Sequence, residues 1–100
     1  MKNIRILDCT LRDGGRVIDC AFADEQTRDI SRRLAGAGIE IVELGFLRDP
    51  ARVEYKGGST FFTRAEQLRP FVVPGSDTLF VAFIDYSLYD FSTLSPCDGS

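Results

Sequence analysis

Residues 6–14 read Ile-Leu-Asp-Cys-Thr-Leu-Arg-Asp-Gly, and the prediction of the fold starts from them. The apolar residues before Asp8 indicate a short β-like segment over residues 3–8. The chain then reaches two glycines at positions 14 and 15, where we expect an irregular loop rather than a regular element. The sequence therefore predicts a strand that ends in an acid and is followed by a glycine-braced loop carrying Arg12 and Asp13.

A helix is predicted for residues 24–37. Its apolar or small residues recur at helical spacing on one face, at Thr27, Ile30, Leu34 and Ala37. Asp24 is a suitable N-cap, because its carboxylate can accept hydrogen bonds from the free amides of the first turn. Gly38 fits the left-handed position that closes a helix, and Ile39 can fold back on the last turn.

The rest of the chain supplies two more predicted strands and a short helix. The strands cover residues 40–45 and 79–84, and an irregular stretch is expected over 48–62. The helix begins with a capping box at residues 63–66 and ends before Pro70. The order is β-α-β-α-β, and the continuous apolar strands indicate a parallel sheet in an α/β fold. The Lys-Gly-Gly-Ser-Thr run at 56–60 lacks the spacing of a phosphate loop and is expected to be an ordinary turn.

The length of 100 residues is small for such a sheet. Three parallel strands leave two open edges and helices with too little sheet to cover. We therefore expect residues 1–100 to form one incomplete domain that is a piece of a larger fold. The alternative is that strands are borrowed from another copy of the chain. In either case the open edges predict self-association into a homo-oligomer.

Composition excludes several classes of function. The net charge of −3 makes nucleic acid an unlikely partner, and no apolar run approaches the roughly 20 residues that a membrane span needs. The absence of histidine excludes catalytic Ser-His-Asp and Cys-His groups within this chain. An odd count of three cysteines favours a reducing compartment, for which the cytoplasm is the default interpretation.

The candidate chemistry lies where the predicted strands end. The carboxyl ends of parallel strands meet at one edge of a sheet, and each predicted strand brings an acid there: Asp8, Glu43 and Asp85. The alternative interpretation is that these acids cap helices or form ion pairs with arginines, at positions 12, 16 and 48.

Arg12 and Asp13 form the sharpest candidate site. A guanidinium beside a metal-binding carboxylate suits a reaction that develops negative charge on an oxygen, such as enolate formation from a carbonyl compound. The alternative is a structural ion pair across a tight turn.

Residues 6–14 resemble the first-strand signature of the DRE-TIM metallolyases, which include hydroxymethylglutaryl-CoA lyase, isopropylmalate synthase and 4-hydroxy-2-oxovalerate aldolase. Residues 35–45 are similar to the end of the first helix and the second strand of that superfamily. The resemblance implies an eight-stranded TIM barrel. It also implies metal-dependent cleavage or formation of a C–C bond in a 2-keto acid or an acyl-CoA, through an enolate.

The resemblance also implies roles for individual residues. Asp13 would bind the divalent metal, Mg²⁺ or Mn²⁺, and Arg12 would stabilise the enolate oxygen. Glu43 matches an acidic position near the site and would be the second catalytic residue beside Arg12. Asp8 and Thr10 would support the site from behind.

Two departures from the superfamily pattern bear on activity. The family completes its metal site with two histidines on a late strand, so the metal site of these residues is expected to be incomplete. A full barrel has eight strands and needs about 250 residues, and this chain would supply about three of those strands. Where 4-hydroxy-2-oxovalerate aldolases carry a catalytic histidine, this sequence has Arg16, whose guanidinium could bind a substrate carboxylate. Asp85 is a second, weaker candidate for substrate binding.

The sequence thus predicts the N-terminal part of an aldolase or lyase, inactive by itself. The alternative is a non-catalytic α/β module that self-associates through its open sheet edges.

Overall fold

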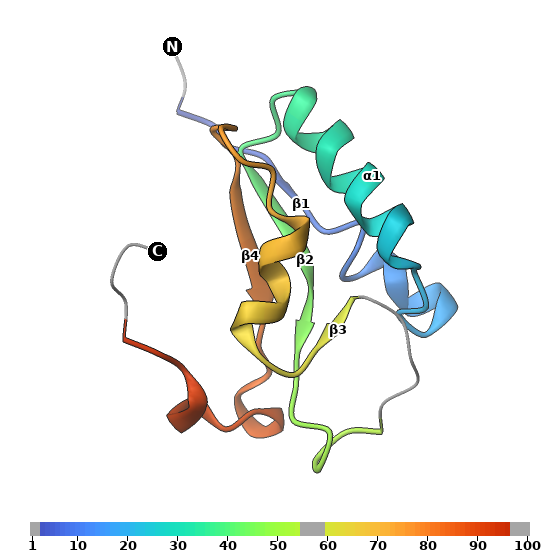
Figure 1. Ribbon diagram of the computed structural model, residues 1–100, viewed down its shortest axis with the longest axis vertical. Helices are drawn as coiled ribbons and strands as arrows, with labels where there is room; N and C mark the ends of the chain where they lie inside the picture. The colour runs from blue at the N-terminus through green and yellow to red at the C-terminus, as the bar shows by residue number, and fades with distance from the viewer. Residues whose placement is uncertain (1–2, 55–59, 97–100) are drawn as a thin grey trace.

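The computed structural model describes residues 3–54 and 60–96, which form one open parallel sheet with helices packed on it (Figure 1). Its strands are β1 (Leu7–Asp8), β2 (Ile41–Leu47), β3 (Phe61–Phe62) and β4 (Leu79–Phe83). The helices are α1 (Asp24–Gly36) and the 3₁₀ helices η1 (Gly14–Ile18), η2 (Ala65–Phe71), η3 (Tyr86–Leu88) and η4 (Phe91–Thr93). The predicted parallel α/β segment is confirmed. It is an open sheet, as expected of an incomplete TIM barrel.

Strand β2 is the centre of the sheet and pairs in parallel with the other three. Its first residues pair with β1 on one side, and β4 pairs along most of its length. Its last residues pair with β3, which lies inside the stretch 48–62 that was predicted to be irregular, so that prediction was wrong at residues 61–62. Most of the expected turn at 56–60 lies outside the described residues.

Gly45 lets β3 approach β2 closely. A Cβ atom added at this position would lie 2.2 Å from the backbone oxygen of Thr60. That oxygen accepts a hydrogen bond from the amide of Phe46 at 2.9 Å. A side chain at position 45 would therefore separate the two strands.

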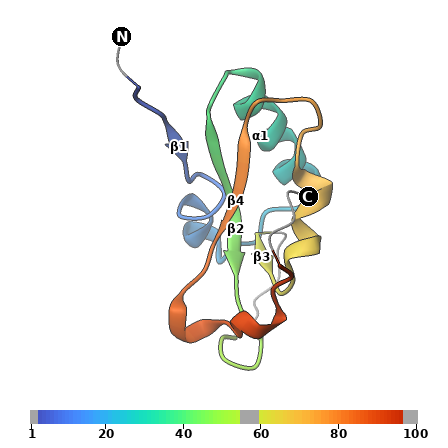
Figure 2. The same ribbon diagram turned by 90° about the vertical axis from the view of Figure 1, so that its left-hand side faces the viewer.

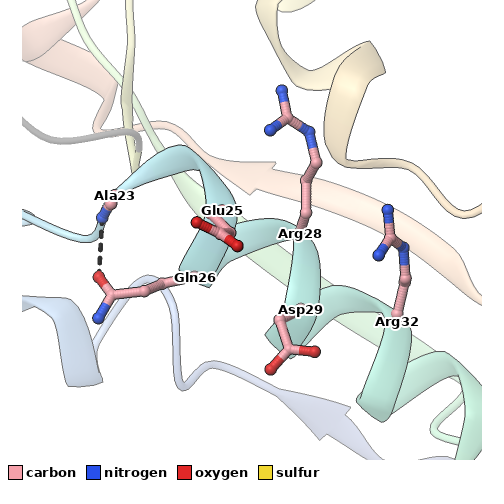
Figure 3. A pocket seen from close by; sticks show the side chains of 6 residues that line it. All are labelled: Ala23, Glu25, Gln26, Arg28, Asp29 and Arg32. Atoms are coloured by element: carbon pink, nitrogen blue, oxygen red, sulfur yellow. Dashed lines mark hydrogen bonds between the residues drawn. The ribbon is translucent and has the colours of Figure 1, made fainter.

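Helix α1 begins at Asp24, as predicted, but its N-cap is Ala23 rather than Asp24. The side-chain oxygen of Gln26 accepts a hydrogen bond from the Ala23 amide at 2.9 Å (Figure 3). The helix ends at Gly36, one residue before the predicted end. The closing motif is as predicted, because Gly38 has a φ of 81° and the Ile39 amide returns to the carbonyl of Leu34 at 3.1 Å.

Three further local predictions were wrong. Helix η1 starts at Gly14, so the glycine pair opens a 3₁₀ helix instead of an irregular loop. At the start of η2, Gln67 rather than Glu66 accepts from the backbone amides of Thr63 and Arg64, at 2.8 and 3.1 Å. Helix η2 also continues through Pro70 to Phe71, beyond its predicted end.

The main core lies between the sheet and the pair α1 and η2, which Figure 2 shows on the same side of the sheet. Val42 and Leu44 of β2 are fully buried there. The apolar residues that pack around them from α1, η2 and β4 are Ile30, Leu34, Leu68, Phe71, Phe80 and Ala82. Because side chains alternate along β2, this placement directs Glu43 to the opposite face. None of the described helices is long and apolar enough to cross a membrane.

Candidate functional site

Arg12 lies in the turn after β1 and forms a largely buried ion pair with Glu43, the third residue of β2. The prediction that Glu43 lies at the carboxyl end of its strand was wrong, because β2 continues to Leu47. The Nε atom of Arg12 donates to Oε2 of Glu43 at 2.5 Å, and Nη2 lies 3.5 Å from Oε1. Only 18% of the Arg12 side chain and 10% of the Glu43 side chain are exposed. The hydrogen bond to Glu43 raises the pKa of Arg12, although burial acts in the opposite direction. The guanidinium is therefore a permanent cation held in one orientation.

The turn after β1 positions this arginine. The amides of Asp13 and Gly14 both donate to the carbonyl of Cys9, at 2.8 and 3.3 Å, which closes a tight turn. Leu11 is fully buried in the main core and anchors that turn. The sequence signal was an arginine beside an aspartate in the loop braced by two glycines.

Asp13 lies beside two arginines and remains accessible. Its Oδ1 atom is 3.6 Å from Nη1 of Arg12 and 3.9 Å from Nε of Arg16, and 58% of its side chain is exposed. Among residues 3–54 and 60–96 no three His, Cys, Asp or Glu side chains are grouped so that they could hold a metal ion. The described residues alone therefore do not fit a divalent metal, since Asp13 offers one carboxylate ligand.

Asp8 and Thr10 interact with each other at the start of the turn. Asp8 accepts hydrogen bonds from the amide and the hydroxyl of Thr10, at 2.9 and 3.1 Å. This pattern is an Asx turn, which fixes the backbone as it leaves β1.

Asp85, just after β4, is paired with Arg48, just after β2. Nη2 of Arg48 donates to Oδ2 of Asp85 at 2.9 Å, and the two side chains are 16% and 33% exposed. The sequence analysis named Arg48 only as an ion-pair partner for an acid. One other feature of the sequence could have marked Arg48 as a candidate site residue. It follows the predicted strand 40–45 after only two apolar residues, Phe46 and Leu47.

The ring of Phe46 joins the arginines into one cluster. The guanidinium carbons of Arg48, Arg16 and Arg12 lie 3.8, 5.5 and 6.0 Å from its centroid. Such distances allow attraction between a cation and the face of an aromatic ring. The sequence analysis missed Phe46, because nothing in the local sequence distinguishes it from an ordinary core residue. We call Arg12, Arg16, Arg48 and Phe46 the arginine cluster.

Two cavities differ in whether residues of the arginine cluster line them. One has a volume of about 200 Å³ and is lined by Phe46, Arg16 and Arg48 of the cluster, together with residues of β3 and of the end of η1. The other, of about 700 Å³, is bordered only by Ala23 and the charged outer side of α1, which Figure 3 shows as one surface of a single helix. The smaller cavity is therefore the one that belongs to the candidate site.

Comparison with known proteins relates the chain to an aldolase and to 2-isopropylmalate synthases. The chain is 39% identical to 4-hydroxy-2-oxovalerate aldolase 6 of Rhodococcus jostii in an alignment of 69 positions, which covers 66% of the chain and 18% of the aldolase. It is 44% identical to 2-isopropylmalate synthase of Saccharolobus solfataricus over 45 residues, which are 45% of the chain and 12% of the synthase. It is also 42% identical to the chloroplastic 2-isopropylmalate synthase 2 of Arabidopsis thaliana over 43 residues.

These relatives are DRE-TIM metallolyases, so the resemblance of the chain to part of that superfamily is confirmed. The matched segments span less than a fifth of the relatives' length. No family model and no solved structure matches the chain.

Proposed function

We propose that residues 1–100 are the N-terminal segment of a TIM-barrel domain that cleaves or forms a C–C bond through an enolate. The observation that carries this proposal is the largely buried Arg12–Glu43 pair beside the carboxyl end of β1. A permanent cation fixed at that edge can stabilise an oxygen that gains negative charge. The substrate class is a small 2-keto acid or an acyl-CoA, by analogy with the aldolase and synthase relatives.

The roles of the residues follow from their contacts. Arg12 is the catalytic residue that faces the developing enolate oxygen. Glu43 acts through Arg12 and is a positioning residue. Asp13 would supply one ligand to Mg²⁺ or Mn²⁺, and the remaining ligands would come from outside the described residues. Asp8 and Thr10 support the turn.

Arg16 and Asp85 are proposed to contribute to substrate binding, Arg16 directly and Asp85 by holding Arg48. We further propose that the segment is inactive alone and works in the cytoplasm, without nucleic acid or membrane partners. The net charge of −3 and the cysteine content support these last points.

The test is the exchange of the C3 protons of pyruvate for deuterium in the presence of Mn²⁺, measured by NMR. The full-length product of the reading frame should catalyse this exchange, residues 1–100 alone should not, and Arg12→Met should reduce the rate at least ~100-fold, the order expected for loss of an oxyanion donor. Arg33→Met, on the exposed outer side of α1, is the matched control. Full exchange activity in Arg12→Met would contradict the proposal.

The second candidate is a non-catalytic α/β module that self-associates. It is favoured by the exposed apolar residues of the β1 edge and the start of β4. Ile4, Ile6, Leu7 and Leu79 are 75, 54, 46 and 57% exposed. Sedimentation equilibrium of residues 1–100 should then show a dimer or a larger oligomer. A monomer at high concentration would remove this candidate and the proposed oligomer together.

A further inference from the structure

Arg48 carries a buried donor that nothing described in the chain satisfies. Its Nη2 atom donates to Asp85, and its guanidinium carbon lies 3.8 Å from the centroid of the Phe46 ring. Its Nε atom is buried and has no hydrogen-bond partner among residues 3–54 and 60–96. A buried N–H group without an acceptor is costly, and such groups in native proteins call for an explanation.

Arg48 lines the cavity of about 200 Å³, so an acceptor for its guanidinium can come from a ligand there. The cavity has Phe46 and Phe61 as apolar walls and Arg16 as a second cation. It also contacts the acids Asp19 and Glu54. Both are exposed residues, so water and salt screen their charges more than the charge of the buried Arg48.

One wall of the cavity is held in an unfavourable backbone conformation. The neighbouring residues Asp19 and Cys20 have φ values of 52° and 61°, a region that residues other than glycine rarely adopt. The Cys20 amide donates to Gly15 at 2.7 Å, and its carbonyl accepts from the Thr60 hydroxyl at 3.3 Å. Backbone strain held in place by surrounding contacts is concentrated at ligand sites.

We propose that this cavity is the subsite for the carboxylate of a small substrate, with Arg48 as its principal donor and Arg16 as a second cation. The volume is below the 300–1,000 Å³ typical of sites for larger ligands, which favours a small acid over the body of a CoA molecule. The identity of that acid as a 2-keto acid rests on the proposed function. The Phe46 ring would then lie between the bound carboxylate and Arg12, whose guanidinium carbon is 6.0 Å from the centroid of the ring.

The experiment is a titration of the full chain with pyruvate, followed through the Nε–Hε NMR signal of Arg48. This signal should shift along a saturable curve, and sodium chloride at the same ionic strength should not reproduce the shift. Arg48→Met should weaken pyruvate binding by about tenfold or more, as expected for a charge-assisted hydrogen bond. Arg33→Met, which removes an exposed arginine of α1, should leave the affinity unchanged.

Two outcomes would overturn the proposal. One is unchanged affinity in Arg48→Met, and the other is phosphate binding as tightly as pyruvate. If Arg48→Met does not fold, Arg48→Lys keeps the charge but lacks the Nε donor, and should also bind more weakly.

The same titration separates this subsite from the proposed function. Pyruvate binding at Arg48 in a protein without exchange activity would reject the proposed function and keep the subsite. Exchange activity that survives Arg48→Met with unchanged KM would reject only the subsite.

Discussion

The two ends of the sheet differ in the side chains that lie there and in whether those side chains have partners within the chain. At the carboxyl ends of the strands, charged groups are buried and paired, as in Arg12 with Glu43 and Arg48 with Asp85. At the β1 edge and the start of β4, apolar side chains face water, and Leu79 is 57% exposed although Leu44 on the neighbouring strand is fully buried. The two ends therefore differ in their charged groups, which are paired within the chain at the carboxyl side. Apolar surface is left at both ends, since Val17 and Tyr86, which follow β1 and β4, are 89% and 87% exposed, and it is available to further structure or a partner.

The largest effect is expected at Gly45, which allows β3 to approach the carboxyl end of β2. Gly45→Ala should lower the free energy of unfolding by about 3 kcal/mol or more, because the added Cβ would meet the Thr60 carbonyl at 2.2 Å. Urea unfolding would measure this change. Gly36→Ala is the control, since nothing lies within 4 Å of its added Cβ, and it should be neutral or stabilising.

Removal of Glu43 should cost about 3 kcal/mol, because it leaves the Arg12 guanidinium buried without its partner. Glu43→Ala can be compared with Glu40→Ala at the start of the same strand, where the carboxylate accepts only a long hydrogen bond of 3.3 Å from Ile6. The Glu40 variant should lose less than about 1 kcal/mol. Equal losses in urea unfolding would mean that the largely buried Arg12–Glu43 pair stabilises the fold no more than the exposed contact of Glu40.

Leu79 and Leu44 test the exposed end against the core. Leu79→Ala should change the free energy of unfolding by less than about 0.5 kcal/mol, as is usual for exposed side chains. Leu44→Ala should cost about 2–5 kcal/mol, because it leaves a cavity in the core. If the start of β4 lies in an interface between copies, Leu79→Ala should also weaken self-association. A loss of several kcal/mol in Leu79→Ala would show that this edge is already covered.

The sequence predicted the regular parts of the fold because their signals are local. The helical spacing from Thr27 to Ala37 and Gly38 at the helix end depend on neighbouring residues, and the structure confirms both. Strand β3 was missed because its two phenylalanines become a strand only by pairing with Phe46 and Leu47 of β2, which lie far earlier in the sequence and which Gly45 allows to come close.

In the candidate site, too, the residues with a local sequence signal were predicted and those that depend on tertiary packing were missed. Arg12 and Glu43 were found because each lies at or near a predicted strand end, where parallel strands bring groups together. Phe46 and the cavity beside Arg48 were missed, since they depend on how η1, β2 and β3 pack. The choice of Gln67 over Glu66 at η2 shows a smaller limit, because a capping motif can act one residue away from its expected position.

The smallest effect concerns Asp90, an exposed carboxylate that contrasts with buried Glu43. The Ser92 hydroxyl donates to it at 2.6 Å and the Ser92 amide at 3.0 Å, and these bonds lower the pKa of Asp90 below its ordinary value of 3.8. A lowered pKa in the folded state means that this carboxylate stabilises the fold above its ordinary pKa, and that the contribution is lost as pH falls through the lowered value. Titration of the Asp90 carboxyl carbon by NMR should show a midpoint below 3.8, and Ser92→Ala should move it back toward 3.8 because the hydroxyl donor is the larger cause. Asp90→Asn should remove this part of the acid dependence of stability. An Asp90 midpoint at 3.8 in the unmodified chain would show that the exposed contacts with Ser92 do not persist in water, unlike the largely buried Arg12–Glu43 pair.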